Sequence, residues 1–344
     1  MAKVTIKDIA ELAQVSKTAV SFAFNSPERL PASTVKRILD IAKSQGYTPN
    51  PVARSMSTGK TNVLGILVPQ PISKIMCNPF YVEFIQGVGD ICTRYGQSLM
   101  LIPPLRGSIQ QAITSAVADG IIIIGLDSHN DVIQAFSQRD IPYLMVDSEC
   151  ESGITCVNID DSVGAYKAMK HLLDLGHKRI TILGILSDKE GEWKKYTGIL
   201  RRRVMAYNKA LKEAGLSIDS PEIDLIECEI TQESGRAGFT KAWESDNRPT
   251  AVICMSDIIA IGALQGAYKL GVNVPTDISV IGFDNIPQSR WTTPQLTTVH
   301  QSILERGELA ADLLNKLIAG EAINERYVLD TDLIVRSSTA QPRK

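Results

Sequence analysis

The sequence predicts a small all-α head followed by an α/β body of two lobes, each built on a doubly wound parallel sheet. Residues 5–45 show the pattern of three short amphipathic helices, the second of which has a polar face. From Val63 onward, short and nearly continuous apolar runs alternate with amphipathic stretches, which is typical of parallel strands covered on both faces by helices. A second set of such runs begins after about residue 157, and the 344 residues suit roughly two domains of ordinary size.

The first expected helix begins at Thr5, a good N-cap residue, and Asp8 three positions later completes an approximate capping box. Its apolar residues recur at helical spacing: Ile6, Ile9, Ala10 and Ala13. Such a face must pack against another element. Gln14 and Val15 follow directly, so a tight turn to a second helix is expected there.

The second expected helix begins after Ser16, another good N-cap residue. One of its faces is apolar and carries Val20, Ala23 and Phe24. The opposite face is mostly polar and carries Lys17, Thr18, Ser21 and Phe22. Because two helices this short cannot form a core alone, residues 31–45 are expected to add a third, which ends at Gly46.

The polar face of the second helix predicts contact with DNA, because such a helix fits the major groove, where Lys and Thr side chains reach base edges and phosphates. Residues 1–62 hold nine Lys or Arg and four Asp or Glu, a net charge of +5, whereas the whole chain carries −2 and the remainder therefore −7. A basic head on an acidic body suits a polyanionic partner that binds the head. The alternative for this stretch is any small helical bundle with a solvated face.

A linker follows the head and holds one short expected helix. Asn50 is placed to cap this helix, Pro51 to begin it and Gly59 to end it. A helix of about two turns is marginal in water and forms only when something holds it. The ending G-K-T resembles a phosphate-binding loop, but the motif fails because its earlier glycine falls on Arg54.

The body is expected to hold two lobes of strands and covering helices. The clearest strands are expected at residues 63–68, 98–102, 120–125 and 143–146 in the first lobe, and at 179–183, 251–254 and 278–282 in the second. Helices are expected at residues 161–175, 203–214 and 257–270. In such sheets ligands bind beyond the carboxyl ends of the strands, and two facing lobes form a cleft there.

Polar side chains follow several of these strands and are placed to face that cleft: Asp147, Ser256, Asp257 and Asp284. Arg203 lies near the start of a following helix. Carboxylates and an arginine can hold a polyhydroxylated ligand through charge-assisted hydrogen bonds, usually beside an aromatic ring. The alternative for any one aspartate after a strand is helix N-capping, above all for Asp257.

Composition disfavours several classes of protein. The six cysteines form no C-x-x-C pair and no close framework, so reduced and buried thiols are expected. The four histidines are scattered, and no nucleophile elbow, dinucleotide fingerprint or metal-ligand spacing occurs, so neither a metal nor another cofactor is expected. No segment reads as a signal peptide or a bilayer-spanning run, which predicts a cytoplasmic protein without a membrane partner.

Seven longer motifs extend over nearly the whole chain. They are T-I-K-D-I-A-E-L-A-Q-V-S from Thr5, A-V-S-F-A-F-N from Ala19, G-Y-T-P-N-P-V-A-R-S-M from Gly46, N-P-F-Y from Asn78, L-G-H-K-R-I from Leu175, S-V-I-G-F-D-N from Ser279 and L-T-T-V-H-Q from Leu296. With these motifs the chain resembles the lactose/galactose-repressor (LacI/GalR) family of bacterial transcription regulators. The resemblance implies a helix-turn-helix head, a periplasmic-binding-protein-like body, and a homodimer that reads two half-sites of a pseudo-palindromic operator in double-stranded DNA.

The resemblance also implies which residues of the head and linker contact DNA: Thr5, Ser16, Lys17, Thr18, Ser21, Phe22, Asn25, Tyr47, Asn50, Ala53, Arg54 and Met56. Phe22 departs from the family, in which Arg or His often stands at that position; a phenyl ring would meet a thymine methyl or a sugar edge instead. The linker resembles the family's hinge helix, which pairs with its dimer mate in the minor groove and wedges a side chain into a base step. Met56 stands where leucine is usual, and a ligand that changes the lobe geometry is expected to change the pairing of the hinge helices.

For the cleft, the resemblance implies effector contacts at Phe80, Tyr81, Asp147, Trp193, Arg203, Ser256 and Asp284. Ser256 stands where some sugar-responsive members carry Asn, and the position of a ring-stacking aromatic falls near Glu233. Trp193 or Tyr196, in the long loop 185–198, is placed to supply that ring; the alternative is that both are surface aromatics.

These patterns predict a head at 1–48, a hinge helix and linker at 49–61, a first lobe at 62–156 with about 290–325, and a second lobe at 157–289 with about 326–344. The expected function is repression controlled by a small ligand, a sugar, bound between the lobes. The tail after Arg336 has no apolar heptads, which favours a dimer over a tetramer. The alternatives are a periplasmic-type sugar-binding protein, which the basic head disfavours, and an enzyme on the same kind of sheet.

Overall fold

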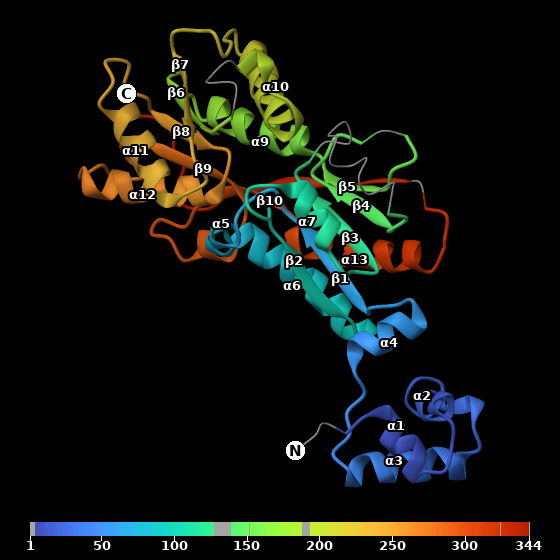
Figure 1. Ribbon diagram of the computed structural model, residues 1–344. Helices are drawn as coiled ribbons and strands as arrows, with labels where there is room; N and C mark the ends of the chain where they lie inside the picture. Colours follow the sequence, from blue (N-terminus) through green and yellow to red (C-terminus); the bar gives the residue numbers. More distant parts are fainter. Residues whose placement is uncertain (1–3, 127–138, 151, 188–192, 324, 344) are drawn as a thin grey trace. The chain divides into compact units, whose positions relative to one another are not determined.

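The computed structural model describes residues 4–126, 139–150, 152–187, 193–323 and 325–343 (Figure 1). The chain divides into two compact units, Met1–Thr61 and Asn62–Lys344. The first unit is all α-helical and the second is built on two sheets. The expected fold class, an all-α head and a two-lobed α/β body, is therefore confirmed.

The head is a small helical bundle. Its elements are α1 (Ile6–Leu12), α2 (Lys17–Asn25), the 3-10 turn η1 (Pro27–Arg29) and α3 (Ala32–Ser44). The Thr5 backbone N–H and hydroxyl both donate to Asp8 Oδ2 at 2.8 Å, and the Thr5 hydroxyl accepts from the Asp8 N–H, so the predicted capping box is confirmed. Gln14, with a φ of 53°, makes the turn between α1 and α2. The core between the helices is formed by fully buried Ile9, Val20 and Ile38.

The linker holds α4 (Pro51–Thr58), and Gly59, with a φ of 68°, follows it. The Gly59 N–H donates to the Ser55 carbonyl, which closes the last turn. Glycine has no Cβ, so it adopts this left-handed backbone conformation at little cost in energy. The helix ends at this position for that reason.

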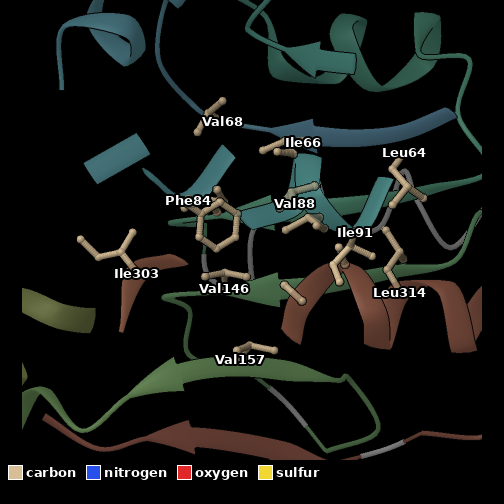
Figure 2. Packing of buried hydrophobic residues seen from close by; sticks show 14 of the residues in the cluster. Leu64, Ile66, Val68, Phe84, Val88, Ile91, Val146, Val157, Ile303 and Leu314 are labelled. Carbon is tan, nitrogen blue, oxygen red and sulfur yellow. The ribbon is translucent and has the colours of Figure 1, made fainter. Parts of the chain in front are cut away.

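The first sheet of the body has the strand order β11-β5-β4-β3-β1-β2, and every pairing in it is parallel. Its strands are β1 (Val63–Leu67), β2 (Ser98–Ile102), β3 (Gly120–Ile124), β4 (Tyr143–Val146), β5 (Cys156–Ile159) and β11 (Arg326–Leu329). The helices that the structure describes in this lobe are α5 (Ile72–Cys77), α6 (Pro79–Tyr95), α7 (Ile109–Ser115) and α13 (Ile303–Ile318). Figure 2 shows the core on the face that α6 and α13 cover, where Phe84 and Val88 pack against Ile66 and Val146.

The second sheet has the order β12-β10-β9-β8-β6-β7, and only its edge strand β12 is antiparallel to its neighbour. Its strands are β6 (Ile180–Ile185), β7 (Ile223–Cys228), β8 (Ala251–Cys254), β9 (Ser279–Asp284), β10 (Thr297–Gln301) and β12 (Thr331–Ile334). The other elements of this lobe are α9 (Asp161–Asp174), α10 (Gly198–Glu213), α11 (Gln232–Trp243), α12 (Asp257–Lys269) and the 3-10 turns η2 (Trp193–Lys195) and η3 (Pro287–Arg290). α9 and α10 cover one face of this sheet, and α11 and α12 cover the other.

The chain crosses between the lobes at places that differ from the expected ones. β5 and β11 both belong to the first sheet, although residues 157–159 and 326–329 were assigned to the second lobe. β10 belongs to the second sheet, although residues 297–301 were assigned to the first. The reason is that these strands are short and their membership is decided by long-range pairing, which a local apolar pattern does not encode.

The expectation of six reduced and buried thiols is wrong for three cysteines. The sulfur atoms of Cys150 and Cys156 are joined in a disulfide, because the chain between β4 and β5 turns back and brings their Cα atoms to 6.6 Å. Cys77, at the end of α5, is exposed. Within the described part of the chain, no helix combines the length and apolar character needed to cross a bilayer.

Candidate functional site

The exposed face of α2 carries the residues expected to contact DNA. Lys17 and Thr18 are exposed, whereas Val20 and Ala23 on the opposite face are buried. The Ser16 hydroxyl caps the helix by accepting from the Ala19 N–H at 3.1 Å. This cap uses the hydroxyl as an acceptor and leaves its proton free to donate.

The ring of Phe22 contacts a positively charged side chain. The guanidinium of Arg29, in η1, lies over its ring at 5.2 Å from the centroid, a cation–π contact that the sequence pattern did not indicate. Asn25 Nδ2 donates to the Ser21 hydroxyl at 3.3 Å, so these two polar side chains are held together near the end of the helix. Phe22 is therefore a platform for a cation as well as an apolar surface.

The linker residues differ in how much of each side chain is buried. Tyr47 is partly buried and packs edge-on against Phe24 at 5.9 Å, and its burial raises the pKa of the phenol. Ala53, Arg54 and Met56 are exposed, and the Met56 side chain is 84% exposed. An unbranched apolar side chain with this exposure is free to insert into a partner surface.

The body contains a cleft of about 310 Å³ at the carboxyl ends of strands from both sheets. Six of the predicted effector residues line it: Phe80, Tyr81, Asp147, Arg203, Ser256 and Asp284. Asp147 follows β4 in the first lobe, and Asp284 ends β9 in the second. The structure thus brings together residues that are far apart in the sequence, at the place where parallel sheets bind ligands.

The two carboxylates of the cleft lie on strained backbone. Asp147 has a φ of 54° and Asp284 a φ of 131°, a region that costs any residue with a Cβ conformational energy. Asp284 Oδ2 accepts from the Ser256 hydroxyl at 3.0 Å and from the Asp257 N–H at 3.3 Å. Strain of this kind persists only where surrounding contacts hold it, and it concentrates at functional sites.

Arg203 is buried, and its partner is Asp161, the first residue of α9 after β5, which the sequence analysis did not name. Its Nε donates to Asp161 Oδ1 at 2.8 Å, and its Nη1 donates to the Met255 carbonyl at 2.6 Å. The neighbouring Arg202 donates through two N–H groups to Asp161 Oδ2, so one carboxylate satisfies both arginines. The Arg203 guanidinium also lies 3.6 Å from the centroid of the Phe283 ring, which fixes its plane.

The partner of Asp147 is Arg306, a residue that the sequence reasoning missed. Arg306 Nη1 donates to Asp147 Oδ1 at 2.7 Å, and Nη2 donates to Gln301 Oε1 at 3.0 Å. Gln301 Nε2 in turn donates to Asp284 Oδ1. A signal was present, because Arg306 falls on the otherwise apolar stripe of α13 that includes Ile303, Ala310 and Leu313.

Burial dominates the electrostatics of the cleft. It raises the pKa of Asp284 to about 6, against the opposing effect of the Arg203 charge. It also raises the pKa of Asp147, and the Arg306 charge partly offsets that rise. Tyr81, with the Asp147 charge adding to the effect of burial, has its pKa raised to about 12 and stays protonated.

Asp257 is not the N-cap of α12, which was the alternative considered for it. The Ser256 hydroxyl caps the helix by accepting from the Ile258 N–H at 3.3 Å. Asp257 is fully buried and accepts from the Ile286 N–H at 3.0 Å and the Thr298 hydroxyl at 2.5 Å. Burial and the neighbouring Asp284 raise its pKa well above the usual range.

Neither aromatic of the loop 185–198 lines this cleft. The Trp193 indole donates to Asp219 Oδ1 at 3.1 Å, the Lys194 ammonium lies over its ring, and the ring packs partly buried against the core of the second lobe. Tyr196 is buried in the core and donates to Glu227 Oε1 at 2.6 Å. Glu233, where the stacking ring was expected, lines an adjoining hollow with Gln70 and Ile230. The assignment of Trp193 to the effector site is therefore corrected, and Phe80 and Tyr81 are the aromatic rings of the cleft, 5.3 Å apart.

Comparison with known proteins decides what this head and body belong to. Residues 5–50 match the model of bacterial regulatory proteins of the lacI family, and residues 169–339 match the periplasmic binding protein-like domain. The HTH-type transcriptional repressor PurR of Mannheimia succiniciproducens is 34% identical over 97% of this chain and 98% of its own. The chain belongs to the LacI family.

Two further LacI-family proteins extend the comparison. Catabolite control protein A of Priestia megaterium is 32% identical over 94% of this chain and 96% of its own. The crystal structure of a LacI-family regulator from Enterococcus faecium with bound ribose superposes with a TM-score of 0.71 at 27% identity, covering 82% of this chain and all of that one. The protein is accordingly a DNA-binding transcriptional regulator with a ligand-binding body, and the alternative of an enzyme is excluded.

Proposed function

We propose that this LacI-family regulator is a homodimeric, cytoplasmic repressor whose operator affinity is controlled by a neutral sugar bound in the cleft of the body. The observation that carries the proposal is the composition of the cleft. Asp147 and Asp284 supply acceptors from the two lobes, Arg203 supplies donors, and Phe80 and Tyr81 supply rings. A polyol that lies between carboxylates and an aromatic ring satisfies its hydroxyls and covers its apolar face.

The charged residues in and around the cleft favour an uncharged ligand. Asp161 is paired with Arg202 and Arg203, and Asp147 is paired with Arg306. The protein therefore neutralises most of its own buried charge before any ligand enters. A ligand with a fixed charge would have to break one of these pairs, which costs several kcal/mol when the remaining partner is left buried.

In the head, we assign the recognition of operator half-sites to the exposed face of α2. Lys17, Thr18 and Ser21 provide donors for base edges and phosphates, and Phe22 provides an apolar surface beside the Arg29 cation. The same assignment extends to Thr5, Ser16, Asn25, Tyr47, Asn50, Ala53 and Arg54. Met56, exposed on α4, is the wedge for a minor-groove base step.

The ligand assignment is tested by a thermal-shift screen of the full-length protein. The panel holds neutral sugars that include D-ribose, the ligand of the Enterococcus faecium relative, together with sugar phosphates and nucleobases. A neutral sugar is expected to raise the melting temperature, because a ligand that binds only the folded state stabilises it in proportion to RT ln(1 + [L]/Kd). Stabilisation by a phosphorylated sugar or a nucleobase, with no response to neutral sugars, would refute the sugar assignment.

The DNA assignment is tested by selection from a pool of palindromic duplexes. Lys17→Ala and Thr18→Ala are expected to relax the preference at particular base pairs, whereas a substitution on the buried face would act through folding. Enrichment of the same operator by both variants and the parent protein would refute the assignment of α2 as the reading element.

A further inference from the structure

The two carboxylates that face the cleft, one in each lobe, are joined by a continuous row of buried hydrogen bonds. The row runs from Asp147 through Arg306 and Gln301 to Asp284 and is called here the carboxylate bridge. Asp147 and Arg306 belong to the first lobe, whereas Gln301 and Asp284 belong to the second. The bond between Arg306 and Gln301 therefore spans a point at which the chain passes from one lobe to the other.

The position of Arg306 is fixed by close packing of the backbone beneath it. The adjoining residue Gly307 faces α6 so closely that a Cβ there would lie 2.3 Å from the Phe84 carbonyl oxygen. On the facing helix, a Cβ at Gly87 would lie 2.2 Å from the Leu304 carbonyl oxygen. These two glycines let α13 and α6 approach closely, which fixes the backbone from which the Arg306 side chain extends.

The guanidinium is also confined on its other sides. The Arg306 side chain is fully buried, and its Cζ lies 5.2 Å from the centroid of the Phe80 ring, which itself lines the cleft. Its Nε is buried with no hydrogen-bond partner among the described residues. A buried cation with an unsatisfied N–H is costly, so a compensating role is expected of it.

We propose that Arg306 is the positioning residue of the effector site, which holds Asp147 ionised with one oxygen towards the cleft and ties that carboxylate to Asp284 across the lobes. This inference rests on the proposed function of the cleft and adds to it a residue that does not itself line the cleft. Because Arg306 Nη1 donates to Asp147 Oδ1, a ligand finds Oδ2 and the remaining lone pair of Oδ1 as acceptors. Asp284 is held at both oxygens, since Gln301 donates to its Oδ1 and the Ser256 hydroxyl and the Asp257 N–H donate to its Oδ2.

The bridge ties the two strained aspartates, one from each lobe, to each other. A ligand whose hydroxyls donate to both carboxylates bonds to both lobes at once. A ligand that bonds to only one of the two carboxylates is not stabilised by the bridge. Arg306 therefore selects ligands whose donor groups reach both lobes at once, as the hydroxyls on opposite sides of a sugar ring do.

The first test needs no ligand and uses four full-length proteins: the parent, Arg306→Met, Asp147→Asn and the double variant. Without Arg306, Asp147 must ionise unpaired, so its carboxyl is expected to stay protonated to higher pH. The folded-to-unfolded ratio of Arg306→Met, relative to the parent, should then fall as pH rises from 5 to 8, by at most about tenfold per pH unit. In the Asp147→Asn background the same substitution should have an effect that does not depend on pH.

Other charged groups near Asp147 do not mimic this result. They are Asp161, Arg202, Arg203 and Tyr81, and Asp284 follows through Gln301. All are present in the four proteins, so their own ionisation cancels in the comparison to first order. If Arg306→Met does not fold, Arg306→Gln replaces it with the same expected pH dependence, and Arg306→Lys, which keeps the cation, is expected to restore most of the pH profile of the parent. A pH-independent difference in both backgrounds would overturn the proposal.

The second test measures the ligand directly, by titration of the four proteins and Arg306→Lys with D-ribose and with the best sugar of the thermal-shift screen. Arg306→Met is expected to bind the sugar at least about tenfold more weakly than the parent at pH 7. Arg306→Lys is expected to recover part of that affinity, because a cation again faces Asp147. Equal affinity of the parent and Arg306→Met would overturn the positioning role. If no sugar binds the parent, the sugar assignment fails, while the pH comparison still decides the role of Arg306.

Discussion

Replacing Arg203 by methionine is expected to lower the free energy of unfolding by an amount that the lost contacts set, and to abolish the response to the ligand. The substitution removes the hydrogen bonds to Asp161 and to the Met255 carbonyl while keeping an apolar side chain against Phe283. Hydrogen bonds that involve a charged group contribute about 1.5–3 kcal/mol each. Arg202 continues to hold Asp161, so that carboxylate is not left unpaired. The two lost bonds together give an expected loss in the free energy of unfolding of about 3–6 kcal/mol.

Arg202→Met is the matched control, because it removes two hydrogen bonds to the same carboxylate from a side chain that is 26% exposed. Water can replace part of that interaction, so a loss of about 1 kcal/mol is expected. Urea denaturation measures both losses, and thermal shift with the cognate sugar measures the response. Arg203→Met should lose the sugar response and retain operator binding below its melting temperature. Equal destabilisation by the two substitutions, or an intact sugar response in Arg203→Met, would refute the reasoning.

Three further predictions concern the head, the hinge and the pH dependence. Thr5→Ala removes the capping box and should cost α1 about 1 kcal/mol, seen as faster hydrogen exchange in its first turn; unchanged exchange would contradict the role of the cap. Met56→Ala should leave the free energy of unfolding within about 0.5 kcal/mol of the parent and weaken operator binding, measured by fluorescence anisotropy, whereas Met56→Leu should bind normally. Folding raises the pKa of Asp284 to about 6, so the stabilisation of its protonated form is complete below the unfolded pKa and is lost as pH rises through 6. Asp284→Asn should flatten that decline in urea midpoints between pH 4 and 6, and an unchanged slope would show that another group causes it.

Local patterns in the sequence were sufficient for part of the elements of the fold. The capping residues Thr5 and Ser16, the apolar stripe of α1 and the continuous runs of β1 and β3 depend on neighbours within a few positions, and the structure confirms them. Residues 157–159 of β5 and residues 326–329 of β11 belong to the first lobe and not to the predicted second one, because four residues of apolar pattern do not specify a distant partner.

The candidate site was predictable in its location and not in its pairings. Strand-end position placed Asp147 and Asp284 at the cleft, since all parallel strands of a sheet end at the same edge. The sequence could not show that Arg306 pairs with Asp147, or that Arg203 pairs with Asp161, because the partners are brought together only by the packing of α13 and α10. Trp193 was misplaced for a similar reason, since the direction of a side chain in a long loop is set by a contact, here with Asp219, that no local pattern reports.

The most direct test of the account is the operator affinity of the full-length protein with and without the sugar found by thermal shift. Affinity for the selected operator should fall steeply with salt, as expected for a basic head that binds phosphates. Saturating sugar should change that affinity by about tenfold or more in the parent and leave it unchanged in Arg203→Met. A sugar that raises the melting temperature of the parent while its operator affinity stays the same would contradict the claim that the cleft controls DNA binding.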